Sequence, residues 1–139
     1  MSTLSTIIID THGEKFHQIT DKVKSEAKKL TGSKSGLLYL FLPHTSCGLL
    51  IQESFDPSAK SDMEKFLKHL APRDLNFIEH TAEGPDDSPS HMKSIVSGHT
   101  LTLIVDNGQL VLGQWQGIYL SEFRDGAHSR KIHLKFLEG

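Results

Sequence analysis

A twelve-residue stretch holds the residues of this chain that are best suited to chemistry. It runs from His80 to His91, reads His-Thr-Ala-Glu-Gly-Pro-Asp-Asp-Ser-Pro-Ser-His, and contains two imidazoles and three carboxylates. Gly, Pro, Asp and Glu bury little apolar surface and interrupt helices and strands, so this loop contributes little to a core. Its density of metal-binding and acid–base groups makes it the first place to look for function.

Histidine side chains supply the first candidate chemistry, which is metal binding. His80 and His91 bracket the loop, and His44 follows an apolar run at residues 36–42. Three neutral imidazoles could bind a divalent transition metal and leave a position open for water or substrate. Zinc or nickel suits these ligands better than magnesium, which would need carboxylates. The spacings match no short zinc motif, so the alternative is three scattered surface histidines.

Glu83, Asp86 and Asp87 supply the acid–base candidates in the same loop. They could ligate a hard cation, orient an imidazole, or act as a general base. The alternative is a solvated acidic turn in which Asp87 or Ser88 caps the following helix. Asp87 and His91 are four residues apart, so a helix beginning near residue 88 would bring them together.

A second group of residues could bind an anionic substrate. Glu122 and Arg124 alternate on a predicted strand, so they share a face and could form an anion clamp or an ion pair. Thr45 and Ser46 offer hydroxyl and backbone N–H groups at the end of the apolar run. Arg130 could add a phosphate contact. The alternative is an ordinary polar turn and a charged sheet edge.

Composition bounds the class of protein. A chain of 139 residues is long enough for one domain, residues 1–139, with a core of its own. The net charge of -2 argues against nucleic-acid binding, which needs clustered positive charge. No apolar run approaches the roughly 20 residues that cross a bilayer, so no membrane partner is expected. The N-terminus lacks the basic region of a signal peptide, and the lone Cys47 cannot form an internal disulfide. These features predict a cytoplasmic protein.

The hydrophobic pattern predicts an α+β fold with a mostly antiparallel sheet core and a few helices. Strands are expected at 3–11, 14–19, 36–42, 48–53, 100–105, 109–112, 115–123 and 131–137, and helices at 21–30, 56–70 and 88–96. The apolar run at 36–42 predicts a central strand buried on both faces. Ser88 is expected to cap the last helix with Pro89 at its first position, and Asn107-Gly108 predicts a tight hairpin turn.

Several motifs follow one another in an order that covers almost the whole chain. They are Pro43-His44-Thr45-Ser46, the segments 48–53, 56–57 and 62–64, the segment from His80 to Lys93, and the segment from Asn107 to Arg124. Together they resemble the YjbQ-like family, also described as secondary thiamine-phosphate synthases. Glu-Gly-Pro-Asp-Asp at 83–87 and Gly-x-Trp-Gln-Gly-Ile-Tyr at 113–119 are each distinctive. Gln114 stands where threonine is usual, and Cys47 where a small residue is common.

The resemblance implies a compact α+β domain with a β-sandwich-like core, assembled as a homotrimer. It also implies a polar, histidine-lined pocket at or near a subunit interface, and thiamine-phosphate synthase activity. That reaction joins hydroxymethylpyrimidine diphosphate to thiazole phosphate and releases pyrophosphate. The matching site residues are His44, His80, His91, Glu83, Asp87, Glu122 and Arg124. A pyrophosphate leaving group needs cationic stabilisation, which a divalent metal together with Arg124, Lys93 and Arg130 could supply.

Two other functions stay open at this stage. The first is metal-dependent hydrolysis of a small phosphorylated metabolite, with Asp87 or Glu83 as base for a metal-bound water. It is kept because no glycine-rich phosphate cradle is present and three histidines suit zinc or nickel. The second is a metal- or metabolite-binding trimer without a catalytic role. An enzyme should depend on Asp87 and Arg124 as well as on His44 and His91, whereas a binder should tolerate Asp87→Asn. A nucleophilic role for Cys47 is disfavoured, because only His44 lies near enough in sequence to lower its pKa.

Overall fold

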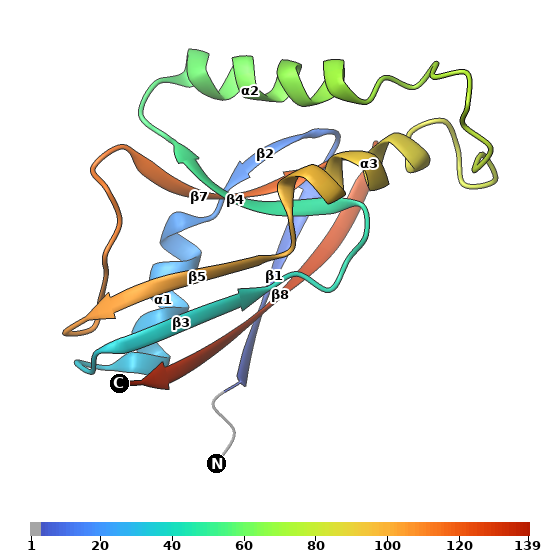
Figure 1. Ribbon diagram of the computed structural model, residues 1–139. Helices are drawn as coiled ribbons and strands as arrows, with labels where there is room; N and C mark the ends of the chain where they lie inside the picture. Colours follow the sequence, from blue (N-terminus) through green and yellow to red (C-terminus); the bar gives the residue numbers. More distant parts are fainter. Residues whose placement is uncertain (1–3) are drawn as a thin grey trace.

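The computed structural model describes residues 4–139 and shows two antiparallel sheets with three helices (Figure 1). The five-stranded sheet has the order β1 (Leu4–His12), β8 (Ala127–Glu138), β3 (Gly36–Phe41), β5 (Thr100–Asp106) and β6 (Gln109–Leu110). The three-stranded sheet has the order β2 (Lys15–Gln18), β7 (Gln116–Glu122) and β4 (Cys47–Glu53). The helices are α1 (Thr20–Thr31), α2 (Pro57–Leu70) and α3 (Asp87–Ser97). The predicted α+β class is confirmed. The predicted first strand began at Thr3, which lies outside the described residues.

The main core lies between the two sheets and is closed by α1. Leu38 of β3 pairs in register with Leu103 of β5 and Phe136 of β8, so the three side chains share the inner face. Ile118 and Leu120 of β7 belong to the same cluster, and both are at most 1% exposed. α1 contributes to this core through its buried apolar positions, which recur at helical spacing as the sequence predicts.

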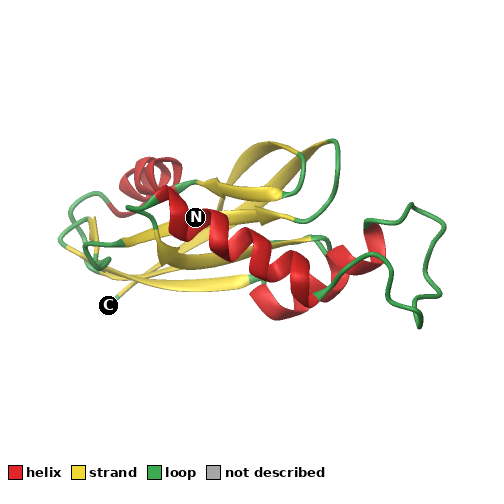
Figure 2. Ribbon diagram, turned by 90° about the horizontal axis from the view of Figure 1, so that it is seen from above, coloured by secondary structure: helices red, strands yellow, loops and turns green. Residues whose placement is uncertain are grey.

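Helix α2 covers the other face of the small sheet, as the view from above shows (Figure 2). A second cluster there joins Leu67 of α2 to Phe16, Tyr119 and Phe123. The strand buried on both faces is therefore β7, not β3. The prediction for residues 36–42 is wrong on this point, because the outward side chains of β3 are 41% and 50% exposed at Tyr39 and Phe41.

Each of the three helices matches its predicted range to within one residue at either end. The Asp56 carboxylate accepts a hydrogen bond from the Ser58 N–H, which makes Asp56 the N-cap of α2. α3 begins at Asp87, one residue earlier than predicted, and its N-cap is Asp86 rather than Ser88. The Asp86 side chain makes no capping bond, because its carboxylate accepts bonds from Arg124 and from the Asp125 N–H. The Asn107-Gly108 turn is as predicted, and both residues have positive φ.

Candidate metal centre

His80, Asp87 and His91 meet where the loop after α2 enters α3. The His80 Nε2 atom lies 2.7 Å from Asp87 Oδ2, and the His91 Nε2 atom lies 3.0 Å from the same oxygen. Asp87 and His91 are one helical turn apart, as their spacing predicts. One nitrogen or oxygen atom from each of the three residues lies within 4.8 Å of the others. This grouping has the composition and size of a metal-ion site.

The hydrogen bond at the other side of the His91 ring decides which nitrogen carries a proton. His91 Nδ1 lies 2.6 Å from the backbone carbonyl oxygen of Thr45, and a carbonyl oxygen only accepts. Nδ1 is therefore the donor, and in a neutral imidazole Nε2 then carries a lone pair. That lone pair faces a carboxylate oxygen 3.0 Å away. The contact is favourable only with a second proton on the ring or a cation between the two atoms.

Asp87 is ionised and shared between the two imidazoles and an arginine. Burial alone would raise the pKa of this carboxyl, which is 5% exposed. The hydrogen bond with His80 and the charges of His91 and Arg124 outweigh burial and hold the pKa below its ordinary value. Arg124 Nη1 lies 3.0 Å from Asp87 Oδ1, which leaves Oδ2 for the imidazole side. Asp87 therefore presents one carboxylate oxygen, Oδ2, to the two imidazoles.

Arg124 ties the end of the loop to the hairpin between β7 and β8. Its Nε donates to Asp86 Oδ2 at 2.9 Å, and its Nη2 donates to the Glu83 carbonyl oxygen at 2.9 Å. The hydrogen bond from Arg124 lowers the pKa of Asp86 to about 2. Among the predicted ligands Asp86 was considered as a metal-binding residue, but its role as the arginine partner was missed.

The predicted clamp of Glu122 and Arg124 does not form. β7 ends at Glu122, so the strand alternation that would put both side chains on one face stops before Arg124. Glu122 is fully buried and pairs instead with Arg130, whose Nε lies 2.8 Å from Oε1. The Thr11 hydroxyl donates to the same carboxylate, and so does the Arg124 backbone N–H. Glu122 is therefore part of the core and Arg124 part of the site.

Of the residues predicted to contact a phosphorylated substrate, one lies at the centre and the others are buried away from it. Thr45 is exposed and lies at the centre through its carbonyl oxygen. Ser46 is buried, and its carbonyl accepts from Arg130 at 3.4 Å. Lys93 is 3% exposed and forms an ion pair with Glu14 at 2.5 Å. The charges of Lys93 and Arg130 are thus matched by the carboxylates of Glu14 and Glu122 and do not face a substrate.

His44 is not brought to the other two histidines. Its Nε2 accepts a hydrogen bond from the Lys131 N–H at 2.8 Å, so Nε2 is not free to bind a metal. Burial, with the nearby charge of Arg130, lowers the pKa of His44 and keeps the ring neutral. Glu83, by contrast, stays close to the centre, with Oε2 at 3.3 Å from His80 Nε2. The structure therefore brings together two of the three predicted histidines with the carboxylate of Asp87.

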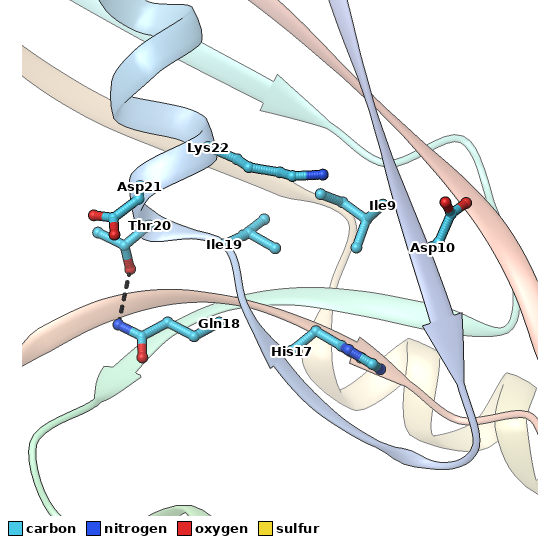
Figure 3. A pocket seen from close by; sticks show the side chains of 8 residues that line it. All are labelled: Ile9, Asp10, His17, Gln18, Ile19, Thr20, Asp21 and Lys22. Atoms are coloured by element: carbon cyan, nitrogen blue, oxygen red, sulfur yellow. Dashed lines mark hydrogen bonds between the residues drawn. The ribbon is translucent and has the colours of Figure 1, made fainter.

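Two other features lie apart from the centre. A pocket of about 460 Å³ opens between β1, β2 and the start of α1, lined by Ile9, Asp10, His17, Gln18, Ile19, Thr20, Asp21 and Lys22 (Figure 3). None of the candidate site residues lines it. Cys47 is fully buried, and burial raises the pKa of its thiol to about 12, which agrees with the expectation that it is not a nucleophile.

Comparison with known proteins places this chain in one family. The family model described as UPF0047 protein YjbQ-like matches residues 5–139. The chain belongs to the YjbQ-like family. The UPF0047 protein YjbQ of Escherichia coli O157:H7 is 39% identical over 127 residues, which cover 91% of each chain. The UPF0047 protein YugU of Bacillus subtilis is 36% identical over 127 residues, covering 91% of this chain and 92% of that protein.

Solved structures of YjbQ-like relatives have the same fold. The conserved hypothetical protein TT1486 from Thermus thermophilus aligns with a TM-score of 0.85 and 38% identity, over 96% of this chain and 99% of that chain. A protein of unknown function from Sulfolobus solfataricus aligns with a TM-score of 0.80 over 98% and 99%, and at 20% identity it shows the fold alone. Within residues 4–139, no helix has the length and hydropathy needed to cross a membrane.

Proposed function

We propose that this chain is a metal-dependent enzyme that acts on a small phosphorylated metabolite, with His80, Asp87 and His91 as ligands of one divalent transition metal. One observation carries the proposal, namely the His91 ring between a carbonyl oxygen at Nδ1 and a carboxylate oxygen at Nε2. In metal sites a ligating imidazole commonly donates its second N–H to a carbonyl or carboxylate, as His91 does to Thr45. A metal between Nε2 and Asp87 would turn the unfavourable facing of two lone pairs into two ligand bonds.

The spacing and chemistry of the donor atoms fit such an ion. Ligands about 2.1 Å from a metal lie about 3.0–3.4 Å from one another in octahedral or tetrahedral arrangements. The two Nε2–Oδ2 separations of 2.7 and 3.0 Å are close to this range. Two imidazoles and one carboxylate suit zinc, nickel and related transition metals better than magnesium. Three protein ligands also leave coordination positions open, which is the arrangement of catalytic rather than structural metal sites.

The charges around the centre say how a phosphorylated substrate would be recognised. Glu83, Asp86 and Asp87 contribute three negative charges, and Arg124 contributes one positive charge. Without a metal this surface repels a phosphate, because negative charge prevails. A bound divalent ion would reverse that balance, bind a phosphoryl oxygen and lower the pKa of a bound water. Phosphate affinity should therefore depend on the metal.

The chain's own residues suit hydrolysis better than transfer of a diphosphate group. Glu83 is exposed beside His80 and could accept the proton of an attacking water. The water oxygen would then bond to phosphorus, the phosphorus–oxygen bond to the alcohol would break, and the departing alkoxide would take the proton back from Glu83. Arg124 remains beside Asp87 and is partly exposed. Transfer to a thiazole nitrogen would instead release pyrophosphate, which needs more fixed positive charge. Lys93 and Arg130 are buried and paired, so they do not supply it.

Thiamine-phosphate synthesis remains the specific alternative, and family resemblance is its support. In that reaction the thiazole nitrogen would attack the pyrimidine methylene carbon, and the carbon–oxygen bond to the diphosphate would break. A metal-dependent assay with both substrates, measured as pyrophosphate release, separates it from hydrolysis, measured as inorganic phosphate release from a panel of phosphorylated metabolites. A protein that binds metal and phosphate but turns over neither class would be the non-catalytic binder.

We also propose that the chain assembles as a homotrimer through the outer face of the five-stranded sheet. That face exposes apolar side chains from four strands, Ile8, Tyr39, Phe41, Ile104 and Leu137. A soluble protein seldom leaves such a contiguous apolar face uncovered. Light scattering should give three times the chain mass, and Phe41→Asp should lower it. A wild-type chain that is monomeric in solution would contradict this assembly.

Elemental analysis of the purified protein tests the centre directly. We expect about one zinc, nickel or similar ion per chain, lost in His80→Ala and His91→Ala. His69→Ala is the matched control, because His69 is an exposed histidine on α2 that no site contact involves. His44→Ala should retain the metal, since His44 lies outside the cluster. A wild-type protein that stays metal-free after incubation with zinc, nickel, manganese and iron would overturn the proposal.

A further inference from the structure

The loop between α2 and α3 carries one of the three proposed ligands and protrudes from the body of the molecule. Residues 71–86 form turns and irregular structure, and both views show this connection extending beyond the sheets (Figures 1 and 2). His80 lies in it, whereas Asp87 and His91 lie on α3. The distance from His80 to its partners therefore depends on how the two ends of the loop are held.

The far end of the loop is held firmly, and the near end starts from a lightly packed helix. At the far end, the Arg124 guanidinium donates hydrogen bonds to the Glu83 carbonyl oxygen and the Asp86 carboxylate. Of the fourteen described residues of α2, Leu67 alone is buried. The neighbouring Phe66 and Leu70 are 57% and 47% exposed. Ala71, the first residue of the loop, is buried, but Arg73 and Asp74 are exposed, so packing restrains the loop weakly beyond Ala71.

Arg73 makes the contact that fixes the near end. Its Nη1 and Nη2 donate to the two carboxylate oxygens of Asp125 at 2.8 and 2.7 Å, a bidentate arrangement. Glu14 lies 3.6 Å from the same guanidinium. Asp125 follows Arg124 directly, so adjacent hairpin residues hold both ends of the loop. His80 therefore lies between two points of the loop that are hydrogen-bonded to the β7–β8 hairpin.

Resting on the metal centre proposed above, we infer that Arg73 is a positioning residue for His80, acting by tying the start of the loop to the β7–β8 hairpin. Arg73 itself contacts neither His80 nor the other ligands in any described hydrogen bond or ion pair, so its effect has to pass through the loop. Arg73 should therefore contribute to the free energy of metal binding only while His80 is present.

A double-mutant cycle tests that claim. Zinc affinity is measured by competition with a chromophoric chelator for the wild type, Arg73→Ala, His80→Ala and the double variant. We expect Arg73→Ala to weaken binding about fivefold, a size in keeping with a partly exposed ion pair acting at one remove. In the His80→Ala background the same substitution should change the affinity by less than about 1.5-fold. Arg73→Lys keeps the positive charge but cannot form the bidentate pair with Asp125. Its zinc affinity should therefore lie between those of Arg73→Ala and the wild type.

Two controls separate this role from general stabilisation. Lys68→Ala removes an exposed cation near the end of the same helix and should leave zinc affinity unchanged. Circular dichroism and thermal unfolding establish that each variant is folded at the temperature of the assay. Equal weakening by Arg73→Ala in both backgrounds would mean a structural role and would overturn the inference, as would no weakening in either.

A metal-free measurement keeps the inference separate from the proposed function. In NMR spectra of the metal-free protein, Arg73→Ala should shift and broaden the ring resonances of His80, with a smaller change in those of His91, whose ring lies 5.5 Å away and contacts the same Asp87 oxygen. Unaltered His80 resonances would contradict the positioning role. If the wild type binds no zinc, but Arg73→Ala still shifts the His80 resonances relative to the wild type, the metal centre is disproved. Arg73 would then remain the residue that holds this loop in place.

Discussion

Two carboxylates of this molecule lie beside an arginine, and they differ in how completely their hydrogen bonds are satisfied. Glu122, between the sheets, receives Arg130, the Thr11 hydroxyl and a backbone N–H, and each donor has an acceptor. Asp87, at the entry of α3, receives Arg124 on one oxygen and faces two imidazole nitrogens with the other. The hydrogen bonds of Glu122 are all formed with donors from the chain itself. At Asp87, a favourable contact with the imidazole nitrogens needs added protons or a bound cation.

The comparison teaches that residue type alone does not separate a structural ion pair from a site. Both clusters contain an acid and an arginine, and both carboxylates have pKa values below the ordinary range despite burial. What differs is the orphaned lone pair at His91 Nε2 and the partial exposure of the imidazoles. Counting donors and acceptors therefore points to one cluster as a scaffold and to the other as a candidate for binding.

The largest effect is expected from breaking the satisfied cluster. Arg130→Ala leaves the fully buried Glu122 carboxylate without its main partner, and removing one member of a buried pair typically costs about 3–5 kcal/mol. Chemical denaturation should show a loss of that size in the free energy of unfolding. Arg124→Ala should cost less, because Asp86 keeps the hydrogen bond from the Asp125 N–H and Asp87 keeps its contacts with the two imidazoles. Equal losses in the two variants would remove the distinction between the two clusters.

The next effect concerns metal affinity and not stability. Asp87→Asn should weaken zinc binding by about 100-fold, because it removes the charged ligand, while the fold persists. Isothermal calorimetry measures the affinity, and circular dichroism checks the fold. Glu122→Gln is the comparison variant, since its carboxylate lies outside the centre. A centre that binds zinc equally well with Asn at position 87 would have a different ligand set.

A smaller effect is the pH dependence that Glu122 imposes on stability. Burial would raise the pKa of Glu122, but its hydrogen bonds from Arg130, Thr11 and the Arg124 N–H lower the pKa below the ordinary 4.5. A carboxyl with a lowered folded-state pKa contributes stability that is fully present above about pH 4.5 and is lost as the pH falls through the folded-state value. Glu122→Gln should therefore cost about 2 kcal/mol at pH 7, and its deficit should shrink in acid. Parallel stability curves for the two proteins from pH 7 to pH 2 would contradict this assignment.

Features that depend on residues close in sequence could be predicted for most of the fold and, at the centre, for the pair Asp87 and His91. The Asn107-Gly108 turn and the four-residue spacing of Asp87 and His91 depend on near neighbours, and each is where it was predicted. Burial of β3 was misjudged because a continuous apolar run has the same sequence pattern whether its outward side chains are buried or exposed. Tyr39 shows the difference, since it is exposed within this chain.

Long-range pairing explains the remaining errors. Lys93 was expected to bind substrate, but its partner Glu14 lies 79 residues away, and no local pattern relates them. His44 depends on β8, whose Lys131 N–H occupies its ring nitrogen. Arg130 did carry a usable signal. It alternates in phase with the inward-facing Ile132 of β8, so strand periodicity could have placed it in the core.

The smallest structural effect, and the sharpest test of chemistry, belongs to Glu83. Its side chain is 55% exposed, so Glu83→Gln should change the free energy of unfolding by less than about 0.5 kcal/mol and zinc affinity by less than about threefold. If Glu83 accepts the proton of the attacking water, metal-dependent phosphate release should still fall by about 100-fold. Glu79→Gln, an exposed acid in the same loop, is the matched control and should keep full activity. Unchanged turnover in Glu83→Gln would leave Asp87 as the base. Asp87 would then have to be ligand and base at once, which its single available oxygen does not favour.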